Sequence, residues 1–371
     1  DGGPGSGKSS VLKRAKELEK ENCNIIVIPE TATEVFASGV ALGGKGGLSA
    51  SDFQKKVLLM QLEKKTRCRE IAERINNGKP TIILEDRGAM SGRPYMPPGE
   101  FEDLVMGLGL NIAELRDKNE GVIHMVTAAI GASGFYTTAN NSARTETPEK
   151  AAALDLKTRE TWIGCPHLRV TESNADFEEK VANTLKTIRH FAGIPRSLEI
   201  ERRFLLGYLG SPDMMAVGMM MLERRYDFRV VGVIIEQIYL KRRAGKPRQR
   251  IRRRIYDGFS LYYQTQKSGL EIGVASEDES RIQRKEYIEL FENERDETRD
   301  IIRKRRYYFL WKNQYFELDI FEKPERLRGL AILEIELLDK NEPVELPPFL
   351  EPLEEITGVE RYSTASLAKK R

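Results

Sequence analysis

The chain begins with residues whose types and spacing are suited to holding phosphate. Residues 2–9 read Gly-Gly-Pro-Gly-Ser-Gly-Lys-Ser, the pattern of a Walker A phosphate-binding loop. In such a loop the glycines let backbone N–H groups face phosphate oxygens, the lysine reaches the terminal phosphates, and the last hydroxyl ligates Mg²⁺. We therefore predict a site for ATP or GTP, with Lys8 catalytic, Ser9 at the metal ion, and further contacts from Gly2, Gly5, Ser6, Gly7 and Ser10. The alternative is a glycine-rich turn that caps an ordinary helix.

The residues after the loop are expected to form a helix with its positive end toward the nucleotide. Over residues 10–21 apolar side chains recur at helical spacing, at Val11, Leu12, Ala15 and Leu18. A phosphate-binding loop normally follows a buried strand, and this chain starts at Asp1 without one. We expect the natural protein to extend upstream and this first strand to be absent from the sequence.

The rest of the first half alternates strand and helix patterns. Residues 24–30 form an apolar run that ends in Pro and Glu, residues 80–87 and 121–127 contain shorter apolar runs, and all three are expected to be buried parallel strands; residues 51–77 have a helical pattern. This order predicts an α/β domain with a mainly parallel sheet, in which ligands bind beyond the carboxyl ends of the strands. Glu30, Asp86 and Thr127 fall at those ends.

Acidic and basic side chains at these strand ends are candidates for chemistry beside the loop. Asp86 can hold Mg²⁺ or accept a proton from an attacking hydroxyl, and Arg87 can neutralise phosphate charge. The alternative for this pair is a strand-terminating turn with a surface ion pair. Residues 136–162 read as a loop followed by a helix that starts at Thr147-Pro148-Glu149. We expect Arg144 and Arg159 to close over the nucleotide as a lid.

The pattern changes after Gly193-Ile194-Pro195, which we take as a domain boundary. From residue 198 on, charged residues alternate with apolar ones, as in strands with one polar face. The charged residues on shared faces are Glu199, Glu201 and Arg203; Arg250 and Arg252; Lys304 and Arg306; Glu317 and Asp319; Glu334 and Glu336; Lys267, Arg284 and Glu286 lie in related segments. A solvated sheet face would explain any one of these pairs.

Like charges at alternate positions repel unless a ligand or metal neutralises them. If the strands close into a barrel, the charged faces line its interior. An acidic sector and a basic sector there would suit a metal ion bridged to a polyphosphate. We predict that Glu199 and Glu201 are catalytic, and that the metal, Mg²⁺ or Mn²⁺, is held by Glu199, Glu201, Glu317, Asp319, Glu334 and Glu336. The predicted substrate-binding residues are Glu30 in the first half and Arg203, Arg250, Arg252, Lys267, Arg284, Lys304 and Arg306 in the second, where Arg and Lys would clamp phosphate oxygens.

Composition limits the remaining possibilities. The 371 residues suffice for two domains, and a net charge of +3 gives no argument for nucleic acid. Cys23, Cys68 and Cys165 share no metal-ligand spacing, so we expect free thiols in a reducing compartment, and a cytoplasmic protein. No apolar run reaches the roughly 20 residues of a membrane helix. The basic block 241–254 lacks the aromatic residues that stack bases, and we predict no nucleic-acid partner.

The first half resembles a known family of nucleotide-binding domains. The residues that carry the resemblance are Gly2–Ser9, Pro29-Glu30, Asp86–Met90, Asn140-Asn141, Arg144, Asp155 and Trp162. They resemble the nicotinamide-riboside-kinase-like branch of P-loop ATPases and, more closely, the TRPL translocation defect family. In that family such a domain is joined to a second, phosphate-handling barrel. The similarity covers most of residues 1–194.

The second half resembles the CYTH, or triphosphate tunnel metalloenzyme, superfamily over about residues 198–340. Its Glu-x-Glu-x-Lys signature is present as Glu199-Ile-Glu201-Arg-Arg203, with Arg in place of Lys. The resemblance implies an eight-stranded antiparallel tunnel that binds a triphosphate-like chain with a divalent metal, and hydrolysis by a metal-activated water. Residues 211–232 match no strand of such a tunnel. We expect residues 341–371 to cover the barrel, and Ser363–Arg371 to be a solvated tail.

Two functions follow from these patterns. The first is a phosphate-handling enzyme in which an ATPase, GTPase or small-molecule kinase domain is coupled to a triphosphate or polyphosphate hydrolase. The alternative is a nucleotide-regulated adaptor whose tunnel binds an anionic headgroup, such as a phosphoinositide, without turnover. Acid pairs at Glu199/Glu201 and Glu334/Glu336 favour the enzyme, because an anion binder gains nothing from them without a metal.

Overall fold

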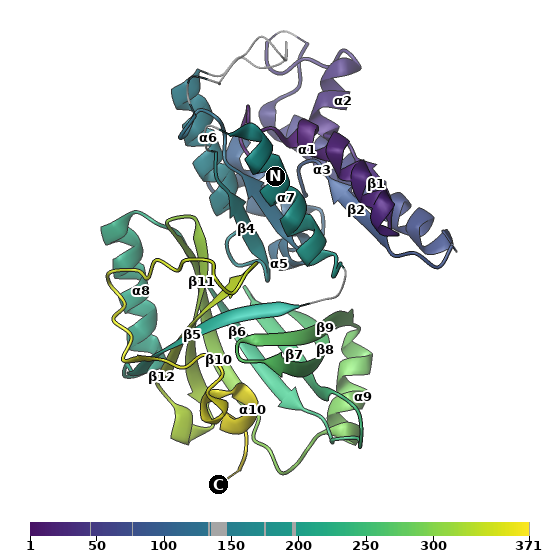
Figure 1. Cartoon of the computed structure of the whole chain (residues 1–371). Helices are drawn as coiled ribbons and strands as arrows, with labels where there is room; N and C mark the ends of the chain where they lie inside the picture. The colour runs from purple at the N-terminus through teal and green to yellow at the C-terminus, as the bar shows by residue number, and fades with distance from the viewer. Residues whose placement is uncertain are drawn as a thin grey trace. The chain divides into compact units, whose positions relative to one another are not determined.

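The structure is a computed structural model that describes residues 1–44, 46–75, 77–132, 134, 147–173, 176–194 and 198–370 (Figure 1). It divides into two units, Asp1–Ile188 and Arg189–Arg371, which are described separately. Asn140, Asn141 and the predicted lid residue Arg144 lie outside the described residues.

The first unit is the predicted α/β domain, built from short parallel strands and helices. β1 (Asn24–Ile28) pairs with β2 (Thr81–Glu85), and β3 (Val122–Met125) pairs with β4 (Leu168–Thr171), both in parallel. β4 was not predicted, because its four residues include Arg169 and carry no long apolar run. Asp1 runs beside β3, donating from its nitrogen to Ile123 O at 2.7 Å and accepting from Met125 N at 2.9 Å.

Helices connect these strands, and local sequence signals set several of their ends. Ser49 caps α3, accepting from Asp52 N at 3.0 Å, and Pro148 stands in the first turn of α6 behind the cap Thr147. The helices are α1 (Lys8–Ala15), η1 (Lys16–Glu21), α2 (Thr31–Ala37), α3 (Ala50–Arg74), η2 (Arg93–Tyr95), α4 (Glu100–Gly107), α5 (Ile112–Asp117), α6 (Pro148–Glu160) and α7 (Phe177–Phe191).

The second unit is a closed antiparallel barrel of eight strands, as predicted. The neighbours run in the order β12-β11-β10-β6-β7-β8-β9-β5, and β5 pairs with β12 to close the ring. The strands are β5 (Glu199–Tyr208), β6 (Val230–Tyr239), β7 (Arg248–Tyr256), β8 (Phe259–Glu271), β9 (Val274–Ile282), β10 (Ile302–Trp311), β11 (Gln314–Lys323) and β12 (Leu330–Leu337). The pairing between β5 and β9 is short and consists of Glu199↔Ala275 and Ile200↔Val274.

Two helices lie on opposite sides of the barrel in Figure 1. α8 (Pro212–Tyr226) occupies the segment that matched no strand, and Met219 on it packs with Phe309, Leu318 and Leu333 in the core outside the barrel wall. α9 (Arg284–Glu294) corrects the prediction for Arg284 and Glu286, which lie in a helix and not on a barrel strand. Gln283 precedes it in an extended conformation, and the strand pattern of the sequence ends there.

The C-terminal segment is part of the barrel and not a tail. β13 (Glu354–Glu355) pairs with β5 at Leu205 and Phe204, on the edge that β9 leaves uncovered. Ala365, in α10 (Thr364–Leu367), and Ala368 are buried with Ile356 against Leu205, Tyr239, Ile302, Phe321 and Ile332. The predicted solvated tail at 363–371 is therefore wrong, because its small residues fill the space under the strands. Two short 3-10 turns, η4 (Glu325–Leu327) and η5 (Glu360–Tyr362), complete the described elements.

Among the described residues, no helix combines the length and the apolar character that crossing a bilayer requires. All three cysteines are free thiols, as predicted.

Candidate functional site

The loop 2–9 is packed so closely that glycine is required at several of its positions. A Cβ on Gly2 would lie 2.3 Å from Met125 O, and one on Gly3 would lie 2.6 Å from Asp155 Oδ1. Gly7 has φ +90° and faces the Phe177 ring at 2.6 Å from where its Cβ would be. β3, α6 and α7 therefore hold the loop from behind, and its backbone conformation is open only to glycine.

Lys8 lies inside this loop. Its Nζ donates to Gly2 O at 2.9 Å, Gly3 O at 3.2 Å and Ser6 Oγ at 3.2 Å. Burial, with the nearby Arg87 cation, lowers the pKa of Lys8 to about 8. Ser9 and Ser10 are exposed in the first turn of α1. Neutral carbonyl partners leave the lysine able to turn toward an anion without breaking an ion pair.

Asp155 anchors the loop from α6. Its Oδ1 accepts from Gly3 N at 2.8 Å and from Thr127 N at 3.0 Å, and its Oδ2 lies 3.0 Å from His124 Nε2. Burial alone would raise the pKa of Asp155, but the bonds from His124 and these N–H groups lower it. The sequence pointed to Asp155 only through the family resemblance. The structure makes it the residue that joins the loop to β3.

Asp86 lies next to the loop at the end of β2, as predicted. It is buried, its Oδ1 has no hydrogen-bond partner in the described part of the chain, and its charge acts on Lys8. An orphaned buried carboxylate oxygen beside Lys8 fits a place for Mg²⁺ with Ser9.

Arg87 and Glu30 form an ion pair, and the Arg87 guanidinium carbon lies 5.6 Å from the Tyr95 ring centroid. Arg87 has a positive φ of 66°, which is unusual for a residue with a side chain, and Gln61 donates to its carbonyl. The structure thus brings Glu30, Asp86 and Arg87 together beside the loop. Arg159, the second predicted lid residue, lies one turn after Asp155 on α6, and burial lowers the pKa of Arg159.

Inside the barrel, charged side chains from many strands meet. Lys267 on β8 contacts Glu199 and lies 3.9 Å from Glu201 and 3.3 Å from Glu277, while Arg250 lies 2.9 Å from Glu277. We call these five residues the Lys267 cluster. Burial alone would lower the pKa of Lys267, but the three carboxylates around it raise it. Burial, together with the charges of Glu277 and Glu201, raises the pKa of Glu199.

A second group, the Arg306 cluster, consists of Arg203, Lys304, Arg306, Glu317, Asp319 and Glu334. Arg306 contacts Glu317, binds Asp319 through two nitrogens at 2.7 Å each, and reaches Glu334 at 2.7 Å. Arg203 Nε donates to Glu334 at 2.7 Å, and Lys304 pairs with Asp319. Burial raises the pKa of Glu317 despite Arg306. Glu336, at the edge of this cluster, lies 3.4 Å from His190.

The predicted residues therefore converge, and most inward acids lie on the neighbouring strands β9, β5, β12 and β11, whereas most inward cations lie on β10, β7 and β8. Arg203 on β5 is an exception, and the acids and cations also form ion pairs with one another. Among the described residues, no three carboxylate, imidazole or thiol side chains form a ready metal site. Sequence reasoning also missed Glu277, Glu279 and Arg254, whose alternate spacing on β9 and β7 was the available signal. Arg252 pairs with Glu279 at 3.3 Å, and Arg254 donates to Tyr308 Oη at 2.6 Å.

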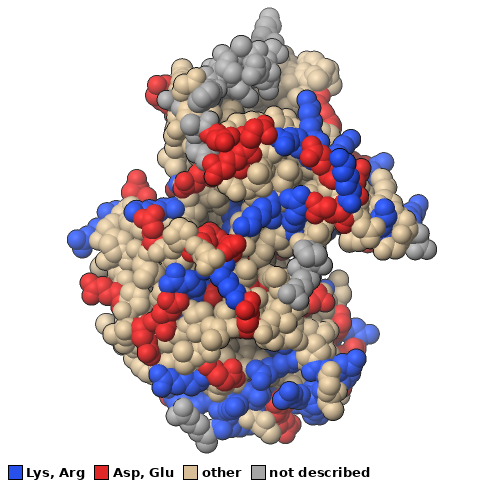
Figure 2. All heavy atoms as spheres, in the orientation of Figure 1, with Lys and Arg blue, Asp and Glu red and all other residues tan. Residues whose placement is uncertain are grey.

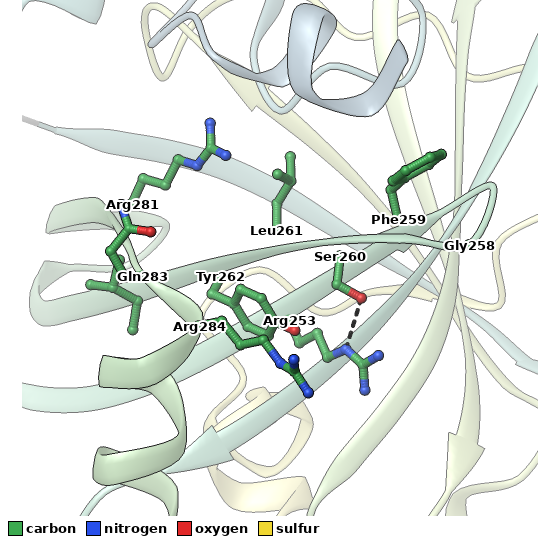
Figure 3. A pocket seen from close by; sticks show the side chains of 10 residues that line it. Arg253, Gly258, Phe259, Ser260, Leu261, Tyr262, Arg281, Gln283 and Arg284 are labelled. Carbon is green, nitrogen blue, oxygen red and sulfur yellow. Dashed lines mark hydrogen bonds between the residues drawn. The ribbon is translucent and has the colours of Figure 1, made fainter. Parts of the chain in front are cut away.

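Arg284 does not join these clusters. It is exposed at the start of α9 and lines a pocket of about 480 Å³ with Arg253, Ser260, Tyr262 and Arg281 (Figure 3). On the face drawn in Figure 2, acidic and basic side chains are interspersed. Only part of the basic block 241–254 faces the barrel interior: Arg250, Arg252 and Arg254 have partners there.

The C-terminal segment touches the charged interior directly. Arg203 N donates to Thr357 Oγ1 at 3.0 Å, Arg203 O accepts from Ile356 N at 2.8 Å, and Arg203 Nη1 donates to Tyr362 O at 3.2 Å. Hydrogen bonds thus fix both the backbone and the guanidinium group of Arg203. A lysine at this position has one nitrogen and could not reach Glu334 and the Tyr362 carbonyl in the same fork.

Residues 1–180 match the model of a family described as an AAA domain. A comparison with curated proteins finds no match.

Several solved structures are similar to part of the chain. The hypothetical protein NE1496 is 27% identical, with a TM-score of 0.30, over 46% of this chain and 97% of its own. The inorganic triphosphatase NE1496 is 25% identical, with a TM-score of 0.30, over 47% of this chain and 95% of its own. The PH1819 protein from Pyrococcus horikoshii OT3 is 22% identical, with a TM-score of 0.29, over 39% of this chain and 80% of its own.

Proposed function

We propose that the barrel binds a triphosphate or short polyphosphate together with a divalent metal and hydrolyses it, and that the first unit binds ATP or GTP. The observation that carries the barrel proposal is its set of buried and half-buried cations. They come from four strands and are Arg203, Arg250, Arg252, Arg254, Lys267, Lys304 and Arg306. Burying so many charges is costly, and ion pairs inside a protein roughly break even against apolar packing. A ligand that uses these charges accounts for their presence better than stability does.

A linear polyphosphate has the chemistry that this interior fits. Each phosphoryl group offers oxygens to guanidinium forks, which bind such oxygens in a bidentate way. When the cations turn to the phosphate chain, their present partners, the carboxylates, lose their countercharge. A divalent cation would then replace it, since carboxylate oxygens are the ligands that Mg²⁺ and Mn²⁺ prefer.

The position of Lys267 supports a cation site among these carboxylates. Its ammonium group lies among Glu199, Glu201 and Glu277, which form an oxygen-lined place that already holds a positive charge. We propose that these three residues hold the divalent ion when Lys267 contacts phosphate. The ion would supply a polarised phosphoryl oxygen and an activated water. Arg250, Arg252 and Arg306 would bind the phosphate chain and stabilise the charge that develops on its oxygens.

The first unit supports nucleotide binding through the packed glycine loop, Lys8 and the AAA-domain match. Asp86 and Ser9 would hold Mg²⁺, and Arg87 lies where it could reach a terminal phosphate. If Asp86 activates a water molecule, this unit hydrolyses the nucleotide. If Asp86 activates a hydroxyl group of a small molecule, the unit transfers phosphate to that molecule.

One observation favours the non-catalytic alternative, an adaptor that captures an anionic headgroup such as a phosphoinositide. Among the described residues, Glu199, Glu277, Glu279, Glu317, Asp319 and Glu334 each pair with a cation, and no cluster of carboxylates forms a ready metal site. In that case the barrel would bind its anion equally well without metal, and the acids would serve only to keep the cations in place.

Phosphate release from triphosphate, pyrophosphate and nucleoside triphosphates with Mg²⁺ or Mn²⁺ separates the two functions. We expect wild type and Lys8→Ala to release phosphate from triphosphate, and Glu201→Gln to bind it without release. Glu236→Gln is the matched control, because Glu236 faces outward and pairs with Arg253 and Arg303. Nucleotide binding should fall at least ~10-fold in Lys8→Ala, the effect of losing hydrogen bonds from a charged group. Metal-independent binding and no release by wild type would support the adaptor.

A further inference from the structure

The pocket at the start of α9 opens at a break in the barrel wall. β9 ends at Ile282, which pairs with Tyr262, and β8 continues beyond that pair through residues 259–261 toward its turn with β7. The chain after Ile282 leaves the sheet to begin α9. The edge of β8 is therefore uncovered by β9 at this point, and the pocket of about 480 Å³ occupies the gap.

Residues from both faces of the wall line this pocket. Arg281 belongs to the inward row of β9, because it follows Glu277 and Glu279 at alternate positions and pairs with Tyr263, while these two pair with Lys267 and Thr265. Arg253 and Tyr262 belong to the outward rows of β7 and β8. Figure 3 shows Arg281 and Leu261 on one side of β8 and Arg253, Tyr262 and Arg284 on the other.

The pocket has a basic lining that continues the charged interior. Its lining residues include Arg253, Arg281 and Arg284 and no Asp or Glu. Arg281 and Arg284 are exposed. Arg253 Nε donates to Ser260 Oγ at 3.0 Å, and its Nη1 lies 3.4 Å from Glu236, which also binds Arg303 at 2.8 Å. Glu236 is thus shared between two arginines and leaves Arg253 only partly neutralised.

We infer that this gap is a subsite for the part of a phosphate chain that extends beyond the barrel interior. The inference rests on the proposed function and names its substrate class, which is linear polyphosphate longer than triphosphate. A chain held by Arg250 and Arg252 meets Arg281 at the end of the same inward rows, and then Arg284 and Arg253 on the outer side. Every added phosphoryl group brings a further negative charge to these arginines.

The two arginines that are exposed allow a test that spares the barrel interior. The dissociation constants of triphosphate and of a polyphosphate of about 15 phosphoryl groups are measured for the full chain by displacement of a labelled triphosphate. The variant is Arg281→Gln/Arg284→Gln. Its control is Lys285→Gln, since Lys285 is the exposed neighbour of Arg284 and faces Glu289 on α9 at 3.9 Å.

We expect wild type to bind the longer chain more tightly than triphosphate. The double variant should weaken binding of the longer chain about 5-fold, the effect of losing two exposed ion pairs, and change triphosphate binding less than 2-fold. The control should change neither, and the loss should shrink at high salt because exposed charges are screened. A parallel measurement with ATP distinguishes an extended phosphate chain from a nucleoside seated on Phe259.

Each other outcome decides against one of the two proposals. Equal loss for both chain lengths, or no loss for the longer chain, overturns the subsite and leaves the barrel site standing. A larger loss for ATP than for the longer chain replaces the phosphate extension with a nucleoside site. If wild type binds no triphosphate at any metal concentration, the proposed function fails and the subsite with it.

Discussion

Arg252 and Arg253 are neighbours in the chain, yet their side chains lie on opposite faces of the barrel wall. Arg252 lies 3.3 Å from Glu279, within the barrel, whereas Arg253 lies 3.4 Å from Glu236 on the outside. The same division separates Arg306, which binds three interior carboxylates, from Arg305, which binds Glu322 at 3.0 Å. Successive side chains of a strand alternate in direction, so one barrel wall carries two independent charge systems.

Replacing Arg306 tests the interior system by stability. Arg306→Gln leaves Glu317, Asp319 and Glu334 without their shared partner, and breaking a buried charge network by removing one member costs about 3–5 kcal/mol. We expect a loss of that size in the free energy of unfolding, measured with urea. Mn²⁺ should restore more stability to this variant than to wild type, since it would replace the lost positive charge. Arg305→Gln is the control and should lose less than about 1 kcal/mol. Equal losses in the two variants would mean that the interior ion pairs contribute no more to stability than the outer ones.

We expect nucleotide binding by the first unit to depend on Asp155. Asp155→Asn keeps the shape but replaces a carboxylate that accepts from Gly3 N, Thr127 N and His124. We expect a loss of about 1–3 kcal/mol in stability and at least ~10-fold weaker nucleotide binding, because the loop loses its anchor. Lys157→Gln, an exposed change on the same helix, should leave both unchanged. Unchanged affinity in Asp155→Asn would show that the loop keeps its conformation without this anchor.

The buried His124 makes the first unit sensitive to pH. Burial lowers its pKa in the folded state, whereas the unfolded chain has a value near 6.5. Below about pH 6.5 the unfolded state takes up a proton that the folded state refuses, so stability is full above this pH and falls as the pH drops. Asp155, whose folded pKa is also lowered, adds a loss in the same direction at lower pH.

Trp162 is buried in the first unit and reports its unfolding. In a Trp311→Phe background, urea unfolding should lose about 1.4 kcal/mol per pH unit below pH 6.5. His124→Asn should remove this dependence between pH 6.5 and 5. A wild-type slope that the substitution does not change would assign the titration to another group.

Thr357 is expected to act on the barrel site through Arg203. Thr357→Val removes the oxygen that accepts from Arg203 N, and Thr357→Ser retains it. We expect Thr357→Val to reduce kcat for triphosphate by about 3–10-fold with KM changed less, since one hydrogen bond is worth about 1 kcal/mol, and Thr357→Ser to restore the rate. If both variants behave alike, Thr357 supports the fold and not the position of Arg203.

The inward charges of β5, β7, β10, β11 and β12 could be predicted, because charged residues recur at every second position within each strand. Two consecutive segments, β9 and the start of α9, were harder to interpret. On β9 the inward Glu277 and Glu279 flank Asp278, and three acids in a row hide the alternation. At Arg284 the spacing Arg-x-Glu imitated a strand, but the chain turns into α9 one residue earlier.

The pairing of acids with bases could not be predicted from the sequence. It depends on how far each strand is shifted against its neighbour, and a pattern within one strand contains no information about that shift. The role of Asp155 was hidden for a similar reason. Its partners Gly3, His124 and Thr127 lie far away in sequence, and only the packing of α6 behind the loop brings them together.

The most direct test of the barrel site is the binding of triphosphate to Arg252→Gln and Arg253→Gln, measured by calorimetry with and without Mn²⁺. If the interior of the barrel holds the phosphate chain, Arg252→Gln weakens binding at least ~10-fold and Arg253→Gln changes it less than 2-fold. Equal effects from the two neighbours, or a larger effect from Arg253, would show that triphosphate binds outside the barrel and would contradict the account.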